Sequence, residues 1–305
     1  MLLSPEGLWR LIKISFQKWY ADSPFQLAAA LAYYTLFSLA PLLIILIGIV
    51  GLFFGSSEAE SHIVGGISEM VGQQSAMAIQ EIVRNANEEG GGLLATLVGF
   101  ALLLFGAGGV VGQLQYSLNS IWGVTAKPDH GWWSIIRARF LSYAMLVGIG
   151  FLLLVSLVLS AVLSAMTKYL GEFLPGADFL WHSADIFISF GFITVLFAMI
   201  YKVLPDVHIA LKDVWIGAAL TSLLFTLGKF LIGLYLGQAS VAATYGAAGS
   251  LVTVLLWVYY SALIFFFGAE ITEVYATEYG SGLVPTEFAE KIQDRGKDAG
   301  KCRRH

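Results

Sequence analysis

The sequence predicts an all-α polytopic membrane protein with six transmembrane helices and with both termini in the cytoplasm. Its composition is 57% hydrophobic and 12% charged over 305 residues, with a mean hydropathy of +0.76. A water-soluble chain of this length needs far more polar surface than that composition supplies. A helix of roughly 20 apolar residues can cross a hydrocarbon core about 30 Å thick. Six segments meet this length, at about 27–54, 93–121, 138–166, 183–203, 214–237 and 247–276.

The distribution of basic residues predicts the orientation, because cytoplasmic connections carry an excess of Lys and Arg. Most of the 17 basic residues fall in the N-terminal segment, in the second and fourth connections and in the C-terminal tail. The first, third and fifth connections contribute only Arg84 and Lys168. Both termini are therefore expected inside. The net charge is −4, and the basic residues follow the alternation that membrane topology explains, so no nucleic-acid partner is expected.

The segment 1–22 is predicted to be an amphipathic helix at the cytoplasmic membrane surface. Its apolar residues recur at helical spacing between basic ones, at Leu8, Ile12, Phe16 and Trp19. An ordinary amphipathic approach to the first span explains this pattern equally well.

The transmembrane domain is predicted over 23–279, with Ser23 capping its first helix and Pro24 at the first helical position. Between the first two spans, apolar residues at helical spacing predict an external helical segment at 55–92. The segment 280–305 is rich in charge and also holds Gly and Pro. It is therefore predicted to be a charged cytoplasmic tail that is solvated and partly disordered.

The sequence lacks the signatures of an enzyme. Its five histidines are scattered, and Cys302 is the single cysteine, so neither a metal cluster nor a thiol-based site is expected. No phosphate-binding loop lies between a strand and a helix. The chain is therefore predicted not to be an enzyme, with no catalytic residues, no metal and no cofactor.

Polar residues recur along one face of two predicted helices, counted at 100° per residue. On the second helix, the residues on or beside this face include Gln113, Ser117 and Asn119. On the sixth helix, they include Ser250, Thr253 and Ser261. The two faces either pack together through interhelical hydrogen bonds or line a polar path for a solute or a lipid headgroup.

An ionisable side chain inside the membrane costs several kcal/mol unless it is paired or hydrated. Lys229 lies inside the fifth predicted span, roughly 12 Å from its external end at 1.5 Å per residue. Asp185, near the external end of the fourth span, is its candidate partner by depth. Lys229 either reaches the interface as a structural residue or serves in substrate binding or gating.

Glu270 and Glu273 lie at the cytoplasmic end of the sixth helix, where negative charge opposes the helix dipole and calls for a compensating cation. The cations predicted on the same side are Arg137, Arg139 and Lys202. The two carboxylates either form a structural ion pair or act in proton coupling or gating.

Pairs of glycines four residues apart let two helix backbones approach closely in lipid. Such pairs occur at Gly51/Gly55, Gly108/Gly112 and Gly233/Gly237. Helix packing is the simpler interpretation and a hinge is the alternative. The same small-residue faces are the predicted contacts of an oligomer.

Several sequence stretches are specific enough to be compared with those of a known protein family. The most specific is Tyr-Gly-Ala-Ala-Gly-Ser-Leu-Val-Thr-Val-Leu-Leu-Trp-Val-Tyr-Tyr-Ser-Ala at 245–262, continued by Phe-Gly-Ala-Glu at 267–270. Supporting stretches are Asn-Ser-Ile-Trp at 119–122 and Tyr-Lys-Val-Leu-Pro at 201–205. These stretches resemble the YihY/BrkB family of bacterial inner-membrane proteins. The resemblance implies a multi-pass protein of the bacterial plasma (inner) membrane. It also implies an envelope function, such as export of lipid or lipopolysaccharide-related material, or serum resistance.

The function predicted from these observations is transport or lipid translocation of an envelope component. The polar faces of the second and sixth helices would line the path, and Lys229 would attract an anionic headgroup. The expected partners are membrane lipids, including an anionic lipid or another amphipathic substrate. The alternative is a non-transporting envelope scaffold, or a virulence or serum-resistance factor that acts through protein partners. The family has also carried a ribonuclease label, but no grouping of carboxylates or histidines around a metal or phosphate supports that activity.

Overall fold

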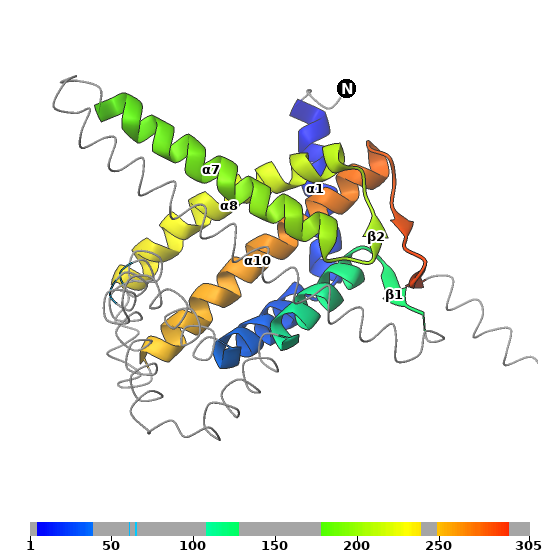
Figure 1. Cartoon of the computed structure of the whole chain (residues 1–305), viewed down its shortest axis with the longest axis horizontal. Coiled ribbons are helices and arrows are strands. Elements are labelled where there is room, and N and C mark those ends of the chain that lie inside the picture. The colour runs from blue at the N-terminus through cyan, green and yellow to red at the C-terminus, as the bar shows by residue number, and fades with distance from the viewer. Residues whose placement is uncertain are drawn as a thin grey trace, which may run out of the picture. The chain divides into compact units, whose positions relative to one another are not determined.

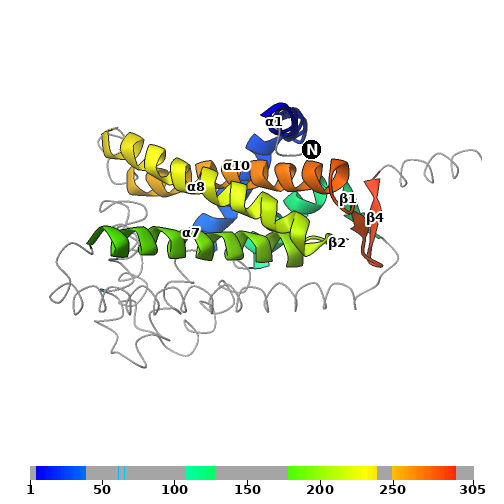
Figure 2. The ribbon, with the colours of Figure 1, turned by 90° about the horizontal axis from the view of Figure 1, so that it is seen from above.

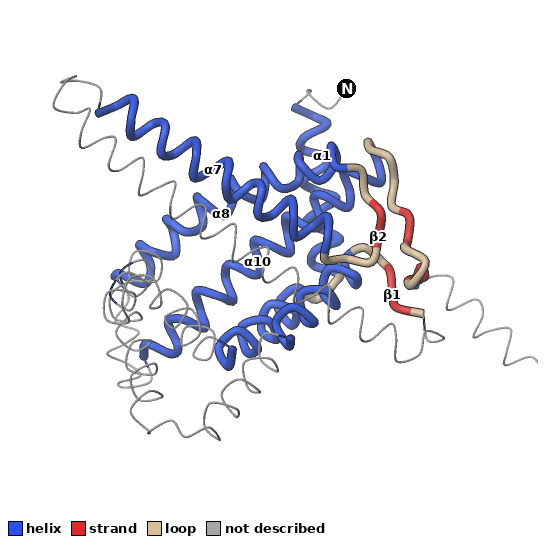
Figure 3. The backbone as a smooth tube through the Cα atoms, viewed as in Figure 1, coloured by secondary structure: helices blue, strands red, loops and turns tan. Residues whose placement is uncertain are grey.

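The computed structural model describes residues 5–38, 61, 65, 108–127, 178–238 and 249–292, and helices dominate them (Figures 1 and 3). The labelled helices are α1 (Pro5–Ala21), α7 (Asp178–Val203), α8 (Leu211–Gln238) and α10 (Gly249–Glu278). Two further helices cover 24–38 and 108–121. The strands are β1 (Val124–Ala126), β2 (Val207–His208), β3 (Val284–Pro285) and β4 (Ala289–Lys291). The helical class predicted from the sequence is confirmed for this part of the chain.

The described helices overlap several of the predicted spans, in whole or in part. Within the described residues, two stretches are long and apolar enough to cross a membrane, Leu211–Ile232 and Leu251–Glu278. They lie in α8 and α10, on the fifth and sixth predicted spans. The third predicted span at 138–166 and most of the external segment at 55–92 lie outside the described residues. The number of spans and the location of the termini therefore stay predictions.

The chain divides into two compact units, each built from distant parts of the sequence. The first unit holds Met1–Asp22, Gln115–Thr226 and Phe266–His305. The second holds Ser23–Leu114 and Leu227–Phe265.

In the first unit, α1 packs on the C-terminal part of α10. Leu11 is buried in a cluster with Ile271, Val274 and Tyr275. The rings of Phe16 and Trp19 also meet Phe267 edge-on, at centroid distances of 6.4 and 5.8 Å. The predicted α1 helix is therefore present, but part of its apolar surface is covered by protein. Leu8, Trp9 and Tyr20 remain exposed.

Helices α8 and α10 approach each other closely within the first unit. A Cβ added at Gly217 would lie 2.7 Å from Thr272 Cβ, and one added at Gly268 would lie 2.7 Å from Thr221 Cβ. Each threonine donates its hydroxyl to the carbonyl of the glycine one turn earlier on its own helix, Thr221 to Gly217 and Thr272 to Gly268. This reciprocal arrangement lets two helices meet without leaving a hydroxyl unbonded.

The second unit uses small residues in the same way. A Cβ at Gly109 would lie 2.7 Å from the ring of Tyr34, and one at Gly228 would lie 3.1 Å from the ring of Tyr260. At Gly112, one of the predicted packing glycines, an added Cβ would have no atom of the described residues within 4 Å. At the start of this unit the helix over 24–38 begins at Pro24, as predicted, and Ser23 has a left-handed φ of 54°.

The C-terminal segment is ordered further than its composition predicts. β4 pairs antiparallel with β1, and β3 pairs antiparallel with β2. Figure 2 shows β1 and β4 beside the C-terminal end of α10. Asp213, in the first turn of α8, also accepts hydrogen bonds from the backbone N–H and the hydroxyl of Ser281. Residues 284–285 and 289–291 thus pair with strands that are distant in the sequence, which the composition of this segment does not predict. The solvation and partial disorder expected of the tail stay predictions.

Candidate functional site in the buried end of α10

Two acidic residues are buried on α10, one helical turn apart. Glu270 has 0% of its surface exposed and Glu273 has 8%. Both lie in the apolar stretch Leu251–Glu278. Buried carboxylates need a cation or hydrogen-bond donors, since burying an isolated charge is very costly. The surroundings of the two groups therefore decide what each of them does.

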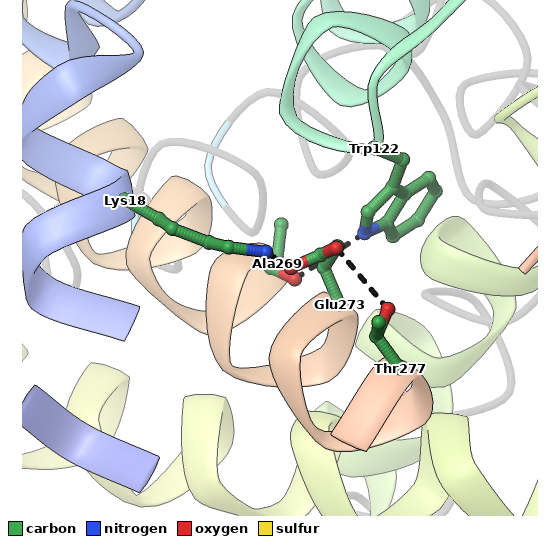
Figure 4. Close-up of polar contacts among 5 residues, drawn as sticks. All are labelled: Lys18, Trp122, Ala269, Glu273 and Thr277. Atoms are coloured by element: carbon green, nitrogen blue, oxygen red, sulfur yellow. Dashed lines mark hydrogen bonds and ion pairs between the residues drawn. The ribbon is translucent and has the colours of Figure 1, made fainter. Parts of the chain in front are cut away.

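Glu273 has its compensating cation. Its Oε2 lies 2.7 Å from Lys18 Nζ, and its Oε1 accepts a hydrogen bond of 3.2 Å from the Thr277 hydroxyl (Figure 4). On the preceding turn, the Trp122 indole donates to the carbonyl of Ala269 at 3.4 Å (Figure 4). Glu273 therefore forms an ion pair that joins α10 to α1.

Glu270 has a different environment. Neither of its carboxylate oxygens accepts a hydrogen bond from an N–H or O–H group among the residues that the structure describes. Among the described residues, the carboxyl of Asp22 lies within hydrogen-bonding reach of Glu270, and Asp22 follows the last turn of α1. Two carboxylates have no hydrogen atom between them, so this contact becomes a hydrogen bond only when one of them carries a proton.

The cations predicted for these carboxylates are placed elsewhere or lie outside the described residues. Lys202 donates to the carbonyl of Ile209. Arg137 and Arg139 lie outside the described residues. Sequence reasoning missed Lys18 and Asp22 as the groups that face α10. Their spacing of four residues at the end of an amphipathic helix is the signal that could have found them.

On the polar face predicted for the second helix, Asn119 meets a partner on a distant segment. Its amide donates to Asp206 Oδ2 at 2.8 Å, and its Oδ1 accepts the Asp206 backbone N–H at 2.9 Å. Gln115 donates to the same Asp206 oxygen at 3.2 Å. Asp206 was also missed, although it directly follows the family-like stretch at 201–205.

The other residues predicted along the path are placed individually. Ser117 is buried, while Gln113 and Ser261 are half-buried. The Thr253 hydroxyl donates to the carbonyl of Gly249. The backbones of three further candidates lie in α7, α8 and α10, with side chains outside the described part of the structure: Asp185, Lys229 and Ser250.

The ion pair gives a stability prediction. Lys18→Met keeps the apolar stem but leaves the Glu273 carboxylate buried without its cation, so we expect a loss of about 1–2 kcal/mol. Lys18 is 45% exposed, which keeps this below the cost of breaking a fully buried pair. Thermal unfolding of the detergent-solubilised protein, followed by tryptophan fluorescence, measures the effect. Glu278→Gln is the matched control, because it breaks the exposed Arg10–Glu278 pair at 3.9 Å. Equal effects of the two variants would contradict a special role for the buried pair.

Comparisons with known proteins agree with a membrane location. A family described as virulence factor BrkB matches residues 15–292. A "UPF0761 membrane protein" of Xanthomonas campestris pv. campestris (strain B100) is 28% identical over 269 residues, which cover 87% of this chain and 58% of that protein. A second, from Xanthomonas axonopodis pv. citri (strain 306), is also 28% identical, over 87% of this chain and 59% of its own length. The chain thus spans less than two thirds of these relatives. No solved structure matches.

Proposed function

The chain belongs to the BrkB virulence factor family of membrane proteins, and from this premise we propose that it translocates a lipid or another amphipathic envelope component across the bacterial inner membrane. In this proposal the protein is multi-pass, with both termini in the cytoplasm. It works as a secondary translocator, without a catalytic reaction of its own.

One observation carries the proposal. Glu270 is a fully buried carboxyl in a helix apolar enough to cross a membrane, and no N–H or O–H among the described residues bonds it. Ionisable groups in such helices are costly, and they mark ion or substrate pathways. Glu273, one turn away, already forms the ion pair with α1, so Glu270 is not needed for that contact. Burial of the Glu270 carboxyl costs free energy, and no hydrogen bond from a described donor offsets that cost. This favours a role in coupling over a purely structural role.

The exposed face of α1 supports a lipid partner. Trp9, Phe16 and Tyr20 are 68%, 54% and 67% exposed, and Lys13 is exposed on the same helix. Aromatic and basic side chains together are typical of helices at the boundary between lipid and water. We therefore infer that α1 lies at the cytoplasmic lipid surface and that anionic headgroups are the ligands it favours.

The polar residues along the helices contribute unequally to the proposal. Asn119 and Thr253 are hydrogen-bonded within the protein, which favours a packing role for both. Gln113 and Ser117 also have interaction partners within the protein. Together with Ser261, Ser250 and Lys229, they are path candidates by their helix positions alone.

The test is phospholipid movement in proteoliposomes that contain the purified protein. Fluorescent lipids in the outer leaflet are quenched by a membrane-impermeant reagent, with and without an imposed proton gradient. The wild-type protein is expected to raise quenching above the outer-leaflet share that protein-free vesicles show. Glu270→Gln is expected to reduce the gradient-dependent rate at least tenfold, which corresponds to about 1.4 kcal/mol of activation free energy.

The control variant is Glu278→Gln, at an exposed position on the same helix. It is expected to move lipid at the wild-type rate. Quenching that stays at the protein-free level under both conditions would count against lipid translocation and favour the scaffold. A Glu270→Gln protein with the wild-type rate would remove this carboxyl from the mechanism.

A further inference from the structure

We propose that Asp22 and Glu270 form a proton-binding site in which the two carboxyl groups share a proton. The site joins the end of α1 to the buried end of α10. Its existence does not depend on lipid transport. Only its use as the coupling site rests on the proposed function.

Glu270 lacks a hydrogen-bond donor among the described residues. Buried polar side-chain atoms nearly always have a hydrogen-bond partner. Both oxygens of Glu270 are buried without a donor in the described part of the chain, and the residue as a whole is 0% exposed. The ligand that satisfies this group must therefore bring a positive charge or a hydrogen atom.

The charged groups around Glu270 indicate which ligand the carboxyl binds. Lys18 is the basic residue facing the pair, and its ammonium is bound to Glu273 at 2.7 Å. Across the described residues, no group of three or more His, Cys, Asp or Glu side chains could hold a metal ion. A divalent cation such as Ca²⁺ takes about six to eight oxygen ligands, whereas a proton between two carboxyl groups needs only two oxygens. The proton is the ligand that fits this pair.

Binding adds one proton to the Asp22–Glu270 pair. A proton from water adds to one carboxylate oxygen, and the resulting O–H donates to the facing carboxylate of the other residue. The pair then carries a single negative charge in place of two. Among the described residues, the other charged groups near the pair are Lys18 from α1 and Glu273 from α10, and these two compensate each other.

The exposure of the two residues indicates a direction of entry. Asp22 is half-buried, whereas Glu270 is fully buried. A proton from water therefore reaches the pair at Asp22 and passes inward to Glu270. Asp22 is the solvent-side member of the site, and Glu270 is the inner member.

Infrared spectroscopy of the full chain in detergent tests the site directly, because a protonated carboxyl has a C=O stretch that a carboxylate lacks. Free Asp and Glu ionise near pH 3.9 and 4.3, so exposed carboxyls give no such band at about pH 7. The wild-type protein is expected to show the band at neutral pH and to lose it in Glu270→Gln. Asp22→Asn is expected to lose it too, because the new amide donates to Glu270 in place of the shared proton.

Glu278→Gln serves as the matched control and is expected to keep the band. If Glu270→Gln fails to fold, Asp22→Asn at the half-buried position decides the result. The proposal is overturned if the wild-type protein has no protonated carboxyl at neutral pH, or if the band survives in folded Asp22→Asn or Glu270→Gln. The infrared experiment measures no transport. Absence of the band from the wild-type protein would therefore overturn the proton site without contradicting lipid translocation. Failure of the lipid assay likewise leaves the proton site standing.

Discussion

Gly268→Val is expected to destabilise the protein more than any other substitution considered, by about 3 kcal/mol or more. The new Cβ would lie 2.7 Å from both Cβ and Cγ2 of Thr221 on α8. Thr221 cannot easily move aside, because its hydroxyl donates to Gly217 and lies 3.3 Å from the Tyr201 hydroxyl. Overpacking of a tight core contact typically costs 1–3 kcal/mol, and here the two further methyl groups of valine add to the clash.

The midpoint of thermal unfolding in detergent, at a fixed scan rate, measures this effect. Gly191→Ala on α7 is the matched control, since no atom of the residues that the structure describes lies within 4 Å of a Cβ at Gly191. It is expected to be neutral or to stabilise slightly, because alanine favours a helix over glycine. The double variant Gly268→Ala/Thr221→Gly removes the opposing side chain and should be more stable than Gly268→Ala alone. A Gly268→Val protein with the wild-type midpoint would show that the two helices do not meet at this position.

Asp206→Leu is expected to have the second largest effect, a loss of about 2–4 kcal/mol. Its carboxylate accepts hydrogen bonds from the side chains of Asn119 and Gln115. Hydrogen bonds to charged groups contribute about 1.5–3 kcal/mol each, and leucine would leave a buried amide at Asn119 without its acceptor. The expected result is a lower unfolding midpoint and easier proteolysis of the connection between α7 and α8.

Asp206→Asn is the control for this prediction. It has nearly the same shape and keeps an oxygen that accepts from Asn119, so most of the stability should remain. Limited proteolysis followed by mass spectrometry locates the cleavage sites. If Asp206→Leu is as stable as Asp206→Asn, the amide contacts do not hold this connection in place.

The helices could be predicted from the sequence because each depends on residues close together in the chain. α8 and α10 fall on two predicted spans, and their ends differ from the predicted ends by three residues or fewer. Pro24 starts its helix as predicted, because proline suits a first turn and lacks only a hydrogen bond that the turn does not use. The strands at 284–291 were missed, since short strands are stabilised by partners and not by their own composition.

The candidate site was predictable in part. Glu270 and Glu273 stand out in the sequence, because charge is rare in an apolar segment of this length. Their neighbours do not stand out. Lys18 lies 255 residues from Glu273 in the chain, and Asp206 lies 87 residues from Asn119. No local pattern connects residues so far apart.

The sequence by itself determined the helical class, the membrane location and the two acidic positions on α10. Hydrophobic length and charge are properties of each segment, and the lipid environment acts on each segment separately. Only the tertiary structure decided that Lys18 neutralises Glu273 and that Asp22 faces Glu270. It also decided that each close contact between α8 and α10 joins a glycine of one helix to a threonine of the other. These contacts depend on which helix faces pack together, and many pairings of apolar helices bury similar areas. Close backbone approach and a small number of buried polar partners select among those pairings.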